Sequence, residues 1–388
     1  MSSRSAASVL APLSVRLVDT DESFHALQPH WDALLDRCAV RTPFMTWDWV
    51  SLRWEQQRGH CKLCVAVVDD PVTRQPLAIA PLMIGREQSG ARKALRAFTF
   101  IGCLGEAPSQ GMDFIVPKGH EAELTPRLCQ VFHRMRSHWD VIDLPTMHGE
   151  SASLPLIRQA LAEFAHVGER QPPQTCYYMA LPASWEEQMA AWKSKERCIF
   201  RSKWRKMMDE HAGRALQGGK DMPAAEAFAH LCRLHSLRFE GSHSLFINEE
   251  SLGFHTRLIE RWMPQGRVLL PMLDMDGNIA AARYGIAYAG TCWSFQAGYD
   301  PAYSQMSVGK LSLGWAVECA IQRGLAAIDH LPGGSGYKEE WSTHTRTVYH
   351  PEAWNPFSAA SLLFRGLRAL KRRRAPTVPT SPQEVPAA

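Results

Sequence analysis

The sequence predicts a mixed α+β protein that consists of two similar units in tandem. Its 388 residues exceed one ordinary compact core, and this length favours two domains. Each half also runs through helices, several short apolar strands, a further helix and a last strand. The two last strands end alike, because residues 141–145 (VIDLP) are echoed by residues 327–332 (AIDHLP). A tandem duplication accounts for this echo.

The first unit is predicted over residues 13–170, after a disordered start at 1–12. It opens with a Trp-rich helical stretch, and Thr46 is the expected N-cap of a second helix. Apolar runs that follow predict a meander of strands. The expected elements are helices at 24–35 and after Thr46, strands at 62–68, 76–84, 95–101 and 112–116, a helix at 121–138 and a strand at 141–144.

The second unit is predicted over residues 171–355, because a turn-rich patch at 171–173 (QPP) separates the halves. Asp276-Gly277 is a tight-turn signal between two strands, and Gly324 is the expected C-cap of a helix. The expected elements are helices at 185–211, 224–240 and 249–262, strands at 267–274, 278–287 and 291–297, a helix at 307–323 and a strand at 326–331.

Composition places the chain among ordinary globular proteins, with 45% hydrophobic and 21% charged residues. The net charge of +4 gives no reason to expect a nucleic-acid partner. Ten cysteines lack framework or zinc-site spacing, so we expect reduced thiols and no metal. The apolar runs are too short for a signal-peptide core or a membrane helix, and we therefore expect a cytoplasmic protein.

The tail at 356–388 differs from both units. Residues 364–374 form a basic helical pattern with six positive charges, and a Pro/Ser/Thr-rich stretch follows that we expect to be disordered. Two interpretations of the basic helix stay open. It can make peripheral contact with an anionic membrane or with a polysaccharide-synthesis complex, or it can be a solvated tail that aids solubility.

The chemistry-bearing stretch lies between residues 293 and 341. A strand that ends at Tyr299 is followed by a turn and by residues 307–310 (SVGK), which open a helix. The first turn of a helix offers unpaired N–H groups and a partial positive charge, and both suit a phosphate. Ser307 is the expected N-cap, Gly309 permits close approach and Lys310 adds a charge. From spacing alone, a plain capped helix is the simpler interpretation.

Several ordered pieces of the second half resemble the acyltransferase domain of the CelD-type GNAT family, which is similar in plan to the Fem-type aminoacyltransferases. The resemblance covers about residues 185–349 and extends loosely to 43–49 in the first half. Its pieces are 234–239 (LHSLRF) with 245–246 (LF), 282–285 (ARYG), 295–301 (FQAGYDP), 307–310 (SVGK), Gly324, Asp329 with 332–334 (PGG), and 337–341 (YKEEW).

The resemblance implies tandem GNAT-like domains, each a mostly antiparallel sheet flanked by helices. It implies transfer of an acyl group from acetyl-CoA or a longer acyl-CoA to a small amine of the sugar or amino-acid type, in exopolysaccharide, cellulose or cell-envelope synthesis. The donor-binding residues would be Gln296, Ala297 and Gly298 at the thioester and Ser307, Val308, Gly309 and Lys310 at the pyrophosphate. The usual arm has two glycines, and this chain has Val308 in place of one.

The resemblance also implies roles in catalysis. Asp329 would orient or deprotonate the amine, Lys338 would stabilise the oxyanion, and Tyr337 or Tyr299 would protonate the leaving thiolate. The structural alternatives are a turn-forming aspartate, a solvated lysine and packing tyrosines. The expected acceptor-side residues are Arg238, Phe246, Tyr299 and Trp341.

Two further functions stay open. One is a Fem-like aminoacyltransferase with aminoacyl-tRNA as donor, and the other is a non-catalytic accessory module of a polysaccharide-synthesis complex. A basic helix at 192–206 either binds an anionic acceptor or is a solvated face. The first half has no counterpart of Tyr337-Lys338, so we expect it to be structural or to supply a wall of the acceptor cleft.

Overall fold

The structure is a computed structural model that describes residues 13–87, 90–105, 109–238, 246, 248–333 and 336–374. The side chains of Arg238, Tyr337 and residues 369–374 are outside this description. The ends at 1–12 and 375–388, for which the sequence predicts disorder, lie outside the described residues as well.

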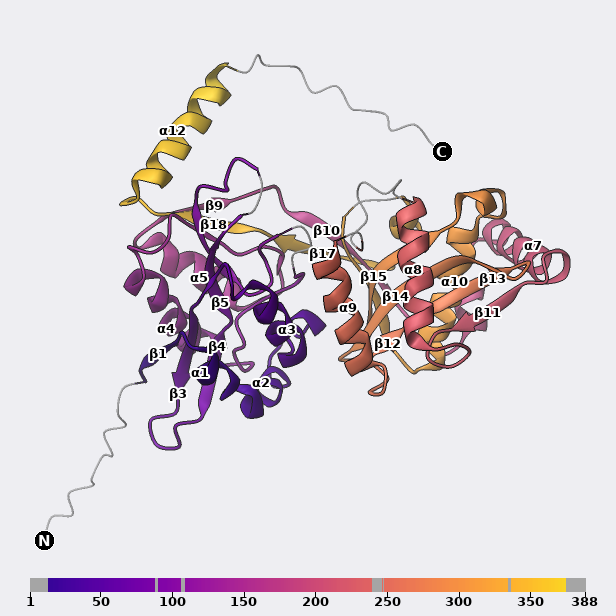
Figure 1. The fold of residues 1–388 in the computed structure, drawn as a ribbon, viewed down its shortest axis with the longest axis horizontal. Coiled ribbons are helices and arrows are strands. Elements are labelled where there is room, and N and C mark those ends of the chain that lie inside the picture. The colour runs from indigo at the N-terminus through magenta and orange to yellow at the C-terminus, as the bar shows by residue number, and fades with distance from the viewer. Residues whose placement is uncertain are drawn as a thin grey trace, which may run out of the picture.

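The first half contains two sheets flanked by helices (Figure 1). One sheet has the strand order β1-β3-β4, and the other has the order β2-β5-β6-β7-β18-β9. The elements are β1 (Val15–Val18), α1 (Asp21–His25), α2 (Gln28–Leu35), η1 (Pro43–Met45), α3 (Trp47–Gln57), β2 (Lys62–Leu63), β3 (Val65–Asp69), β4 (Pro76–Ala80), β5 (Leu82–Arg86), β6 (Arg96–Phe100), α4 (Glu121–Arg134), β7 (Val141–Asp143), β8 (Met147–His148), α5 (Ser153–Ala162) and β9 (His166–Glu169).

The second half is built on one large, mostly antiparallel sheet with the order β11-β13-β14-β15-β16-β10-β17-β8. Short strand β12 pairs with β14. The elements are β10 (Gln174–Ala180), α6 (Trp185–Ala191), α7 (Ser194–Glu210), β11 (Arg214–Gln217), α8 (Ala224–Arg238), α9 (Glu249–Trp262), β12 (Val268–Leu269), β13 (Pro271–Met275), β14 (Asn278–Tyr288), β15 (Thr291–Tyr299), η2 (Pro301–Met306), α10 (Val308–Gln322), β16 (Ala327–Pro332), α11 (Gly336–Trp341), β17 (His344–Tyr349), β18 (Pro351–Trp354) and α12 (Ala359–Arg374).

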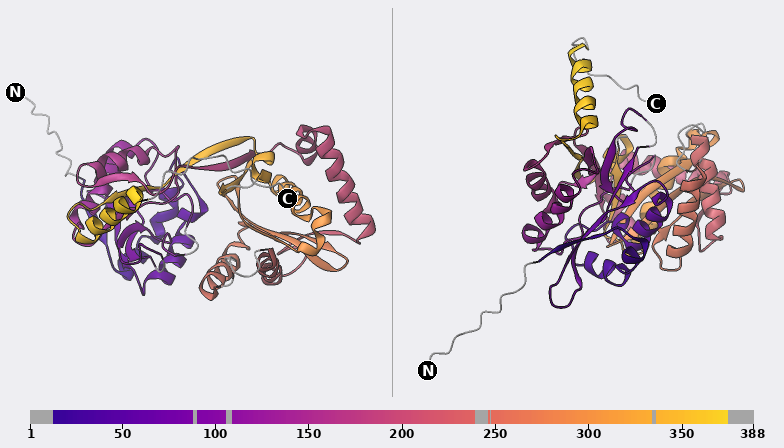
Figure 2. Two further views of the ribbon diagram at one scale, coloured as in Figure 1. Left: turned by 90° about the horizontal axis from the view of Figure 1, so that it is seen from above. Right: turned by 60° about the vertical axis from the view of Figure 1, so that its left-hand side comes forward.

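Helices cover both faces of this sheet. Helices α8 and α9 lie on the face that looks toward the first half, and α10 packs on the opposite face (Figure 2). Gly298 permits the close packing of α8, since a Cβ there would lie 2.4 Å from the backbone nitrogen of His235. On the other face, Gly314 of α10 permits the ring of Phe200 to approach, which seats α7 on α10. Small residues in β15 and α10 therefore set the spacing of these layers.

The two halves exchange strands. Strand β18 of the second half pairs with β7 and β9 of the first, and β8 of the first half pairs with β17 of the second. One hydrophobic core extends from Val15 to Ala353 and includes both halves. Residues 351–354, which the sequence grouped with the second unit, thus complete the sheet of the first.

The duplication seen in the sequence has a structural counterpart. Strands β6 and β7 pair in parallel at Ala97↔Val141 through Thr99↔Asp143, and β15 and β16 pair in parallel at Thr291↔Ala327 through Trp293↔Asp329. A long helix precedes the second strand of each pair, namely α4 and α10. The echoed sequences therefore occupy the same position in the two units, as a tandem GNAT-like fold requires.

Several local predictions are wrong. The predicted helix at 24–35 is divided into α1 and α2, and the predicted strands at 62–68, 76–84 and 267–274 are divided into β2 and β3, β4 and β5, and β12 and β13. Residues 112–116 do not form a strand, because only Ile115 bridges to Ile79 before the chain turns. The helix predicted over 185–211 is broken into α6 and α7 at Trp192, which has extended backbone angles (φ −75°, ψ 152°). The break lets the Trp192 ring pack against Trp185 and Phe200. By contrast, the Asp276-Gly277 turn is confirmed, with both residues at positive φ.

Candidate functional site

Strands β15 and β16 diverge after three paired residues. Their pairing covers Thr291–Trp293 and Ala327–Asp329, whereas β15 continues to Tyr299 and β16 to Pro332. Each strand keeps its other neighbour along this length, because β15 pairs with β14 up to Tyr299 and β16 pairs with β10 up to Pro332. The sheet is thus held on both sides of the divergence, which is a fixed feature of the fold.

The turn after β15 leads into α10 through a left-handed residue. Ser307 has φ 54° and ψ 39°, and its carbonyl oxygen accepts hydrogen bonds from the backbone N–H groups of Lys310 (2.8 Å) and Leu311 (3.1 Å). Ser307 occupies the N-cap position as predicted, but its side chain makes no capping bond. Its Oγ accepts a hydrogen bond from Lys203 Nζ at 2.6 Å instead. The prediction of a capping side chain is therefore wrong, and the turn is tied to α7.

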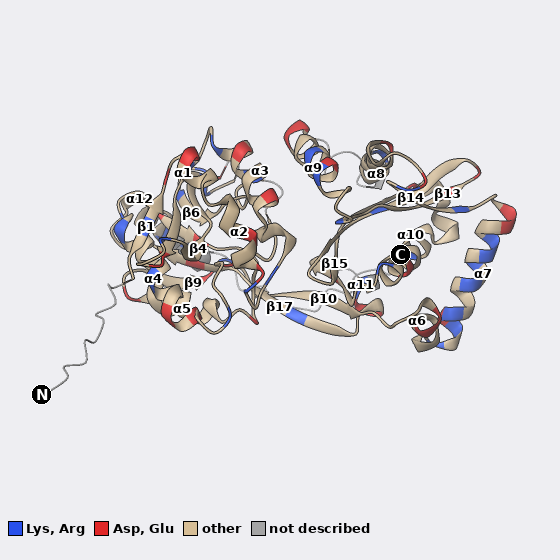
Figure 3. Ribbon diagram, turned by 90° about the horizontal axis from the view of Figure 1, so that it is seen from below, with Lys and Arg blue, Asp and Glu red and all other residues tan. Residues whose placement is uncertain are grey.

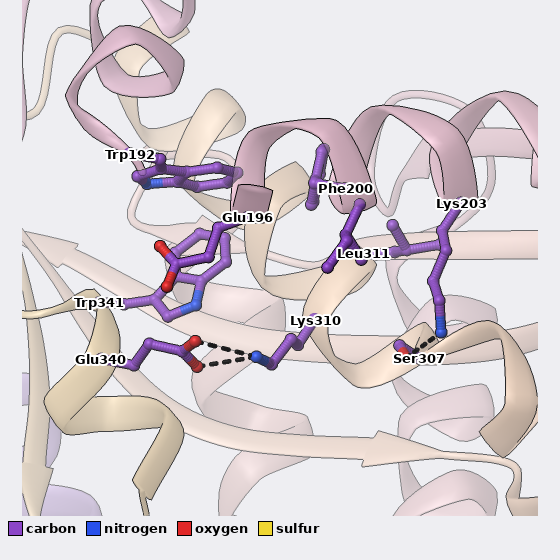
Figure 4. A pocket seen from close by; sticks show the side chains of 10 residues that line it. Trp192, Glu196, Phe200, Lys203, Ser307, Lys310, Leu311, Glu340 and Trp341 are labelled. Carbon is purple, nitrogen blue, oxygen red and sulfur yellow. Dashed lines mark hydrogen bonds and ion pairs between the residues drawn. The ribbon is translucent and has the colours of Figure 1, made fainter. Parts of the chain in front are cut away.

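A pocket of about 100 Å³ opens beside this turn, between α7, α10 and α11 (Figure 4). We call it the α10–α11 pocket. Lys310 points into it and binds both carboxylate oxygens of Glu340, at 3.1 and 2.8 Å. The lining residues are Trp192, Glu196, Ile199, Phe200, Lys203, Ser307, Lys310, Leu311, Glu340 and Trp341. Cationic groups of α7 and α10 thus meet at the first turn of α10, where an anion is favoured.

Aromatic rings form the outer wall of this pocket. Trp341 packs edge-on against Trp192 with ring centroids 4.5 Å apart, and Trp192 contacts Phe200 at 5.2 Å. The sequence placed Trp341 on the acceptor side. The structure brings it next to Lys310 and Ser307 instead, with the residues predicted to bind the donor.

The predicted thioester-binding residues occupy the diverging part of β15. A bulge near Gln296 shifts the register with β14. Gln296 Oε1 lies 3.0 Å from His235 Nε2 on α8, and Gly298 lies against the α8 backbone. Tyr299, the residue after Gly298, lies beside Gly309 of α10 and not beside α8. Gln296 and Gly298 thus contact α8 on one face of the sheet, and Tyr299 contacts the start of α10 on the other.

Asp329 sits where β15 and β16 separate. It is fully buried, and its Oδ1 accepts a hydrogen bond from the backbone N–H of Leu331 at 2.8 Å. Its Oδ2 has no hydrogen-bond partner within the described part of the chain, and Arg346 Nη1 lies 3.8 Å away. Burial raises the pKa of this carboxyl, and the Leu331 N–H and the Arg346 charge oppose the rise. One oxygen thus holds the turn, and the other faces the guanidinium of Arg346.

The first half contributes a buried imidazole to the same face of the sheet. His148 reaches this sheet through the exchanged strand β8, and its ring lies 6.3 Å from that of Trp293, the strand partner of Asp329. Burial and then the charge of Arg346 lower the pKa of His148 to about 4, so the ring is neutral at pH 7. Sequence reasoning missed His148, because only the strand exchange brings it to Trp293 and to the charge of Arg346.

The remaining predicted site residues have different surroundings. Lys338 Nζ donates to the backbone carbonyl oxygens of His330 (2.9 Å), Gly333 (3.2 Å) and Leu331 (3.4 Å), so it fixes the turn after β16. Phe246 is buried and packs against the rings of Phe228 and His235. The side chains of Tyr337 and Arg238 lie outside the described residues, and their roles stay predictions.

Buried polar groups also gather on the α8–α9 side of β15. His255 and Tyr284 are fully buried, and neither His255 nitrogen nor the Tyr284 hydroxyl has a hydrogen-bond partner among the described residues. Burial lowers the pKa of His255 and raises that of Tyr284. All ten cysteines lie in described segments and are free thiols. In those segments, no three His, Cys, Asp or Glu side chains are grouped as metal ligands.

Comparisons with known proteins agree with this geometry. Residues 184–339 match the family described as acetyltransferase (GNAT) domain, in agreement with the resemblance found over 185–349. No curated protein matches the chain. The crystal structure of FemX aligns with a TM-score of 0.60 and 8% sequence identity, over 88% of this chain and 98% of that chain. At this identity the likeness shows the fold alone.

Two more solved structures align over most of the chain. A tandem GNAT protein from the clavulanic acid biosynthesis pathway gives a TM-score of 0.49 and 9% identity, over 89% of this chain and 100% of that one. A conserved protein of unknown function from Bacteroides thetaiotaomicron VPI-5482 gives 0.49 and 11%, over 88% and 99%. The family match and the diverging strands together place a GNAT-type acetyltransferase domain at residues 184–339, and the chain shares its overall fold with FemX.

Proposed function

We propose that this chain is an acyl-CoA-dependent N-acyltransferase. The observation that carries the proposal is the divergence of β15 from β16, with the turn at 307–310 and the α10–α11 pocket, which Lys203 and Lys310 help to line, beyond the end of β15. A sheet opened between two otherwise paired strands gives an extended ligand a place to lie along the β15 backbone. The turn beyond it suits the phosphates of that ligand.

The residues of the turn fit a phosphate-bearing donor. A Cβ built at Gly309 meets nothing closer than Tyr299 Cδ1 at 3.8 Å, so the backbone of this turn is open to approach. Lys310 and Lys203 supply two positive charges beside it. We assign the donor phosphates to Lys310, Lys203 and the first-turn N–H groups of α10, and the thioester end to residues 296–298. Acyl-CoA brings the activated acyl group, and the chain binds and orients it.

In the usual pyrophosphate arm a second glycine leaves the backbone open to the phosphates. In this chain we assign that part of phosphate binding to Lys203. Val308 occupies that glycine position, so the backbone of the turn is less open there than in the usual arm. The ammonium of Lys203 reaches the turn from α7 and already binds Ser307 Oγ and the carbonyl oxygen of Gln305. A charge delivered from a separate helix compensates for the altered turn.

We assign the proton of the acceptor amine to Asp329. An amine must be neutral to attack a carbonyl carbon, and its ammonium form must first lose a proton. Asp329 Oδ2 is the buried carboxylate oxygen without a hydrogen bond, and burial makes this group a stronger base. His148 faces the same site as a neutral imidazole, which can accept a hydrogen bond from the amine without repelling a cation. The thiolate would take its proton from Tyr299 or Tyr337.

The acceptor class and the pathway rest on the resemblance to CelD-type proteins. We propose an amine of the sugar or amino-acid type as acceptor, and exopolysaccharide, cellulose or cell-envelope synthesis as the process. Acetyl-CoA and longer acyl-CoAs are both candidate donors.

The experiment that tests the proposal is a thermal-shift titration of the whole chain with acetyl-CoA and with acyl-CoAs of increasing length. A bound donor raises Tm, because it binds the folded chain and not the unfolded one. We expect stabilisation by at least one acyl-CoA, and acceptor-dependent release of CoA with a panel of amino sugars and amino acids. Failure of every acyl-CoA to bind would refute CoA use, and binding without transfer to any amine would favour the accessory-module hypothesis.

A second candidate is a Fem-like aminoacyltransferase with aminoacyl-tRNA as donor. Two observations favour it, the FemX-like fold over nearly the whole of both chains and the basic residues along α7, which Figure 3 shows in blue. The two candidates differ in their donor. A side-by-side assay with acetyl-CoA and aminoacyl-tRNA separates them, since transfer from aminoacyl-tRNA alone would replace the first proposal by the second.

A further inference from the structure

The last helix, α12, projects from the first half (Figures 1 and 2), and the contacts described for it lie between Ser358 and Arg368. Phe364 stacks on Trp354 with ring centroids 5.4 Å apart and planes 16° apart. Ser358 Oγ donates to Asp140 Oδ1 at 2.6 Å, and the side chain of Ser361 is buried. These contacts set the direction of α12 and leave its outer side uncovered.

The outer side of α12 exposes large apolar side chains. Phe357, just before the helix, is 79% exposed, and Leu363 is 66% exposed. Leu362 and Leu367 are each more than half exposed. Leu363 and Leu367 are four residues apart and therefore lie on one face of the helix. Four of the large apolar residues most exposed in the described chain thus gather on one short segment, which marks an interaction surface.

The same segment is strongly basic. Residues 365–374 contain six arginines and lysines, and the sequence has no Asp or Glu between Glu352 and Glu384. The acidic partner recorded for this group is Glu352, 3.9 Å from Arg368 Nη1. The segment therefore carries a strong net positive charge.

We propose that α12 docks the chain on an anionic membrane surface as an interfacial helix. Exposed leucines beside a cationic remainder are the features by which such helices bind lipid, with the apolar side in the acyl boundary and the charges at the headgroups. Positive charge alone would bind any polyanion. The exposed leucines favour a membrane, because a polyanion offers no apolar region in which to bury them. Among the described helices, none is long and apolar enough to cross a membrane, so α12 lies on the surface.

The test is co-sedimentation of the whole chain with vesicles. Phosphatidylcholine vesicles are compared with vesicles that also contain a quarter of phosphatidylglycerol, at low and high salt. We expect binding to the anionic vesicles, little binding to the neutral ones, and weaker binding at high salt because surface charges are screened.

Two pairs of variants separate the apolar from the electrostatic contribution. Leu363→Ser with Leu367→Ser removes the apolar face, and we expect vesicle affinity to fall by about a hundredfold, roughly tenfold for each leucine that leaves lipid. Arg365→Gln with Arg372→Gln removes two charges, and we expect a fall of about thirtyfold, since each basic residue near an anionic surface contributes about 1 kcal/mol. The double-leucine variant keeps its fold, because its side chains are exposed.

Matched controls come from other surfaces of the chain. Val72→Ser removes an equally exposed apolar residue in the loop before β4, and Lys195→Gln with Lys206→Gln removes two charges from α7. These controls should bind vesicles like the unaltered chain. Several results overturn the proposal: no binding to anionic vesicles, equal loss in the α7 control, binding of heparin but not of vesicles, or a leucine-dependent dimer in sedimentation velocity.

Discussion

The ion pair between Lys310 and Glu340 gives a sharp test of the donor site. In the proposed donor-bound state Lys310 binds phosphate, so its bond to Glu340 has to break first. The change Glu340→Gln removes this internal competitor and leaves Lys310 in place. We expect the variant to bind acetyl-CoA more tightly and to be slightly less stable.

The size of the effect follows from the exposure of the pair. Lys310 Nζ lies 3.1 and 2.8 Å from the two oxygens of Glu340, with side chains 53% and 36% exposed. An ion pair this exposed contributes about 0.2–1 kcal/mol, because solvent screens it. The same energy opposes donor binding, so Glu340→Gln should lower the Kd by up to about fivefold and the free energy of unfolding by up to about 1 kcal/mol.

Isothermal titration calorimetry measures the change in Kd, and urea unfolding measures the change in stability. The matched control is Glu339→Gln, which removes an exposed carboxylate from the same helix but not from the α10–α11 pocket. Pantetheine, which lacks the phosphates, is the ligand control and should bind both variants equally. Unchanged or weaker acetyl-CoA binding by Glu340→Gln, or the same gain with pantetheine, would refute the reasoning.

Three further predictions concern single residues. Gly309→Ala should leave Tm unchanged or higher, because alanine favours a helix and its Cβ meets only ordinary contacts. The same change should weaken acetyl-CoA binding at least about tenfold. An unchanged Kd by calorimetry would contradict this prediction. Asp329→Asn should lower acceptor-dependent CoA release about a hundredfold or more, as expected for a general base. Its Tm at pH 7 should be equal or higher, because a buried carboxyl with a raised pKa stabilises the fold only while protonated, and this stability is lost as pH rises through the raised pKa. Burial raises the pKa of Asp113 to about 7. Asp113→Asn should therefore be more stable than the unaltered chain at pH 8, and this gain in stability should be much smaller at pH 5. An equal difference in urea midpoints at both pH values would contradict this.

The sequence predicted much of the second half because its strands and helices carry strong local signals. The helix at 249–262 coincides with α9, and its N-cap Asn248 accepts a hydrogen bond from Ser251 as a capping residue should. The strands on either side of Asp276-Gly277 were also predicted, because that pair takes positive φ at low cost. Such signals are local in the chain, and therefore a single sequence reveals them.

The strand exchange between the halves could not be predicted in the same way. Strands β8 and β18 are short, and their partners lie far away in sequence, at Val348 and at Ile142. Nothing in residues 147–148 distinguishes an exchanged strand from a loop. His148 was overlooked for this reason, and so was the closing of the first sheet by residues 351–354.

The sequence predicted which residue types belong to the site, but it did not predict most of the contacts between them. Ser307 and Lys310 do line a pocket, together with Lys203 and two glutamates. Lys203 lies at the turn at 307–310 because the chain breaks at Trp192 and α7 then runs past the turn. The sequence did not reveal this break. The contact of Trp341 with Trp192 could not be predicted from sequence, because Trp192 lies at the break after α6, far from Trp341 in the chain.

Hydrogen exchange with and without acetyl-CoA tests the central claim most directly. The claim is that the donor lies along the diverging part of β15 and ends at the first turn of α10. We predict that acetyl-CoA slows exchange of backbone amides at residues 294–299 and 307–311, and leaves the corresponding parallel strand β6 of the first half unchanged. Slowed exchange confined to the first half, or no change at either segment with acetyl-CoA at saturating concentration, would contradict the account.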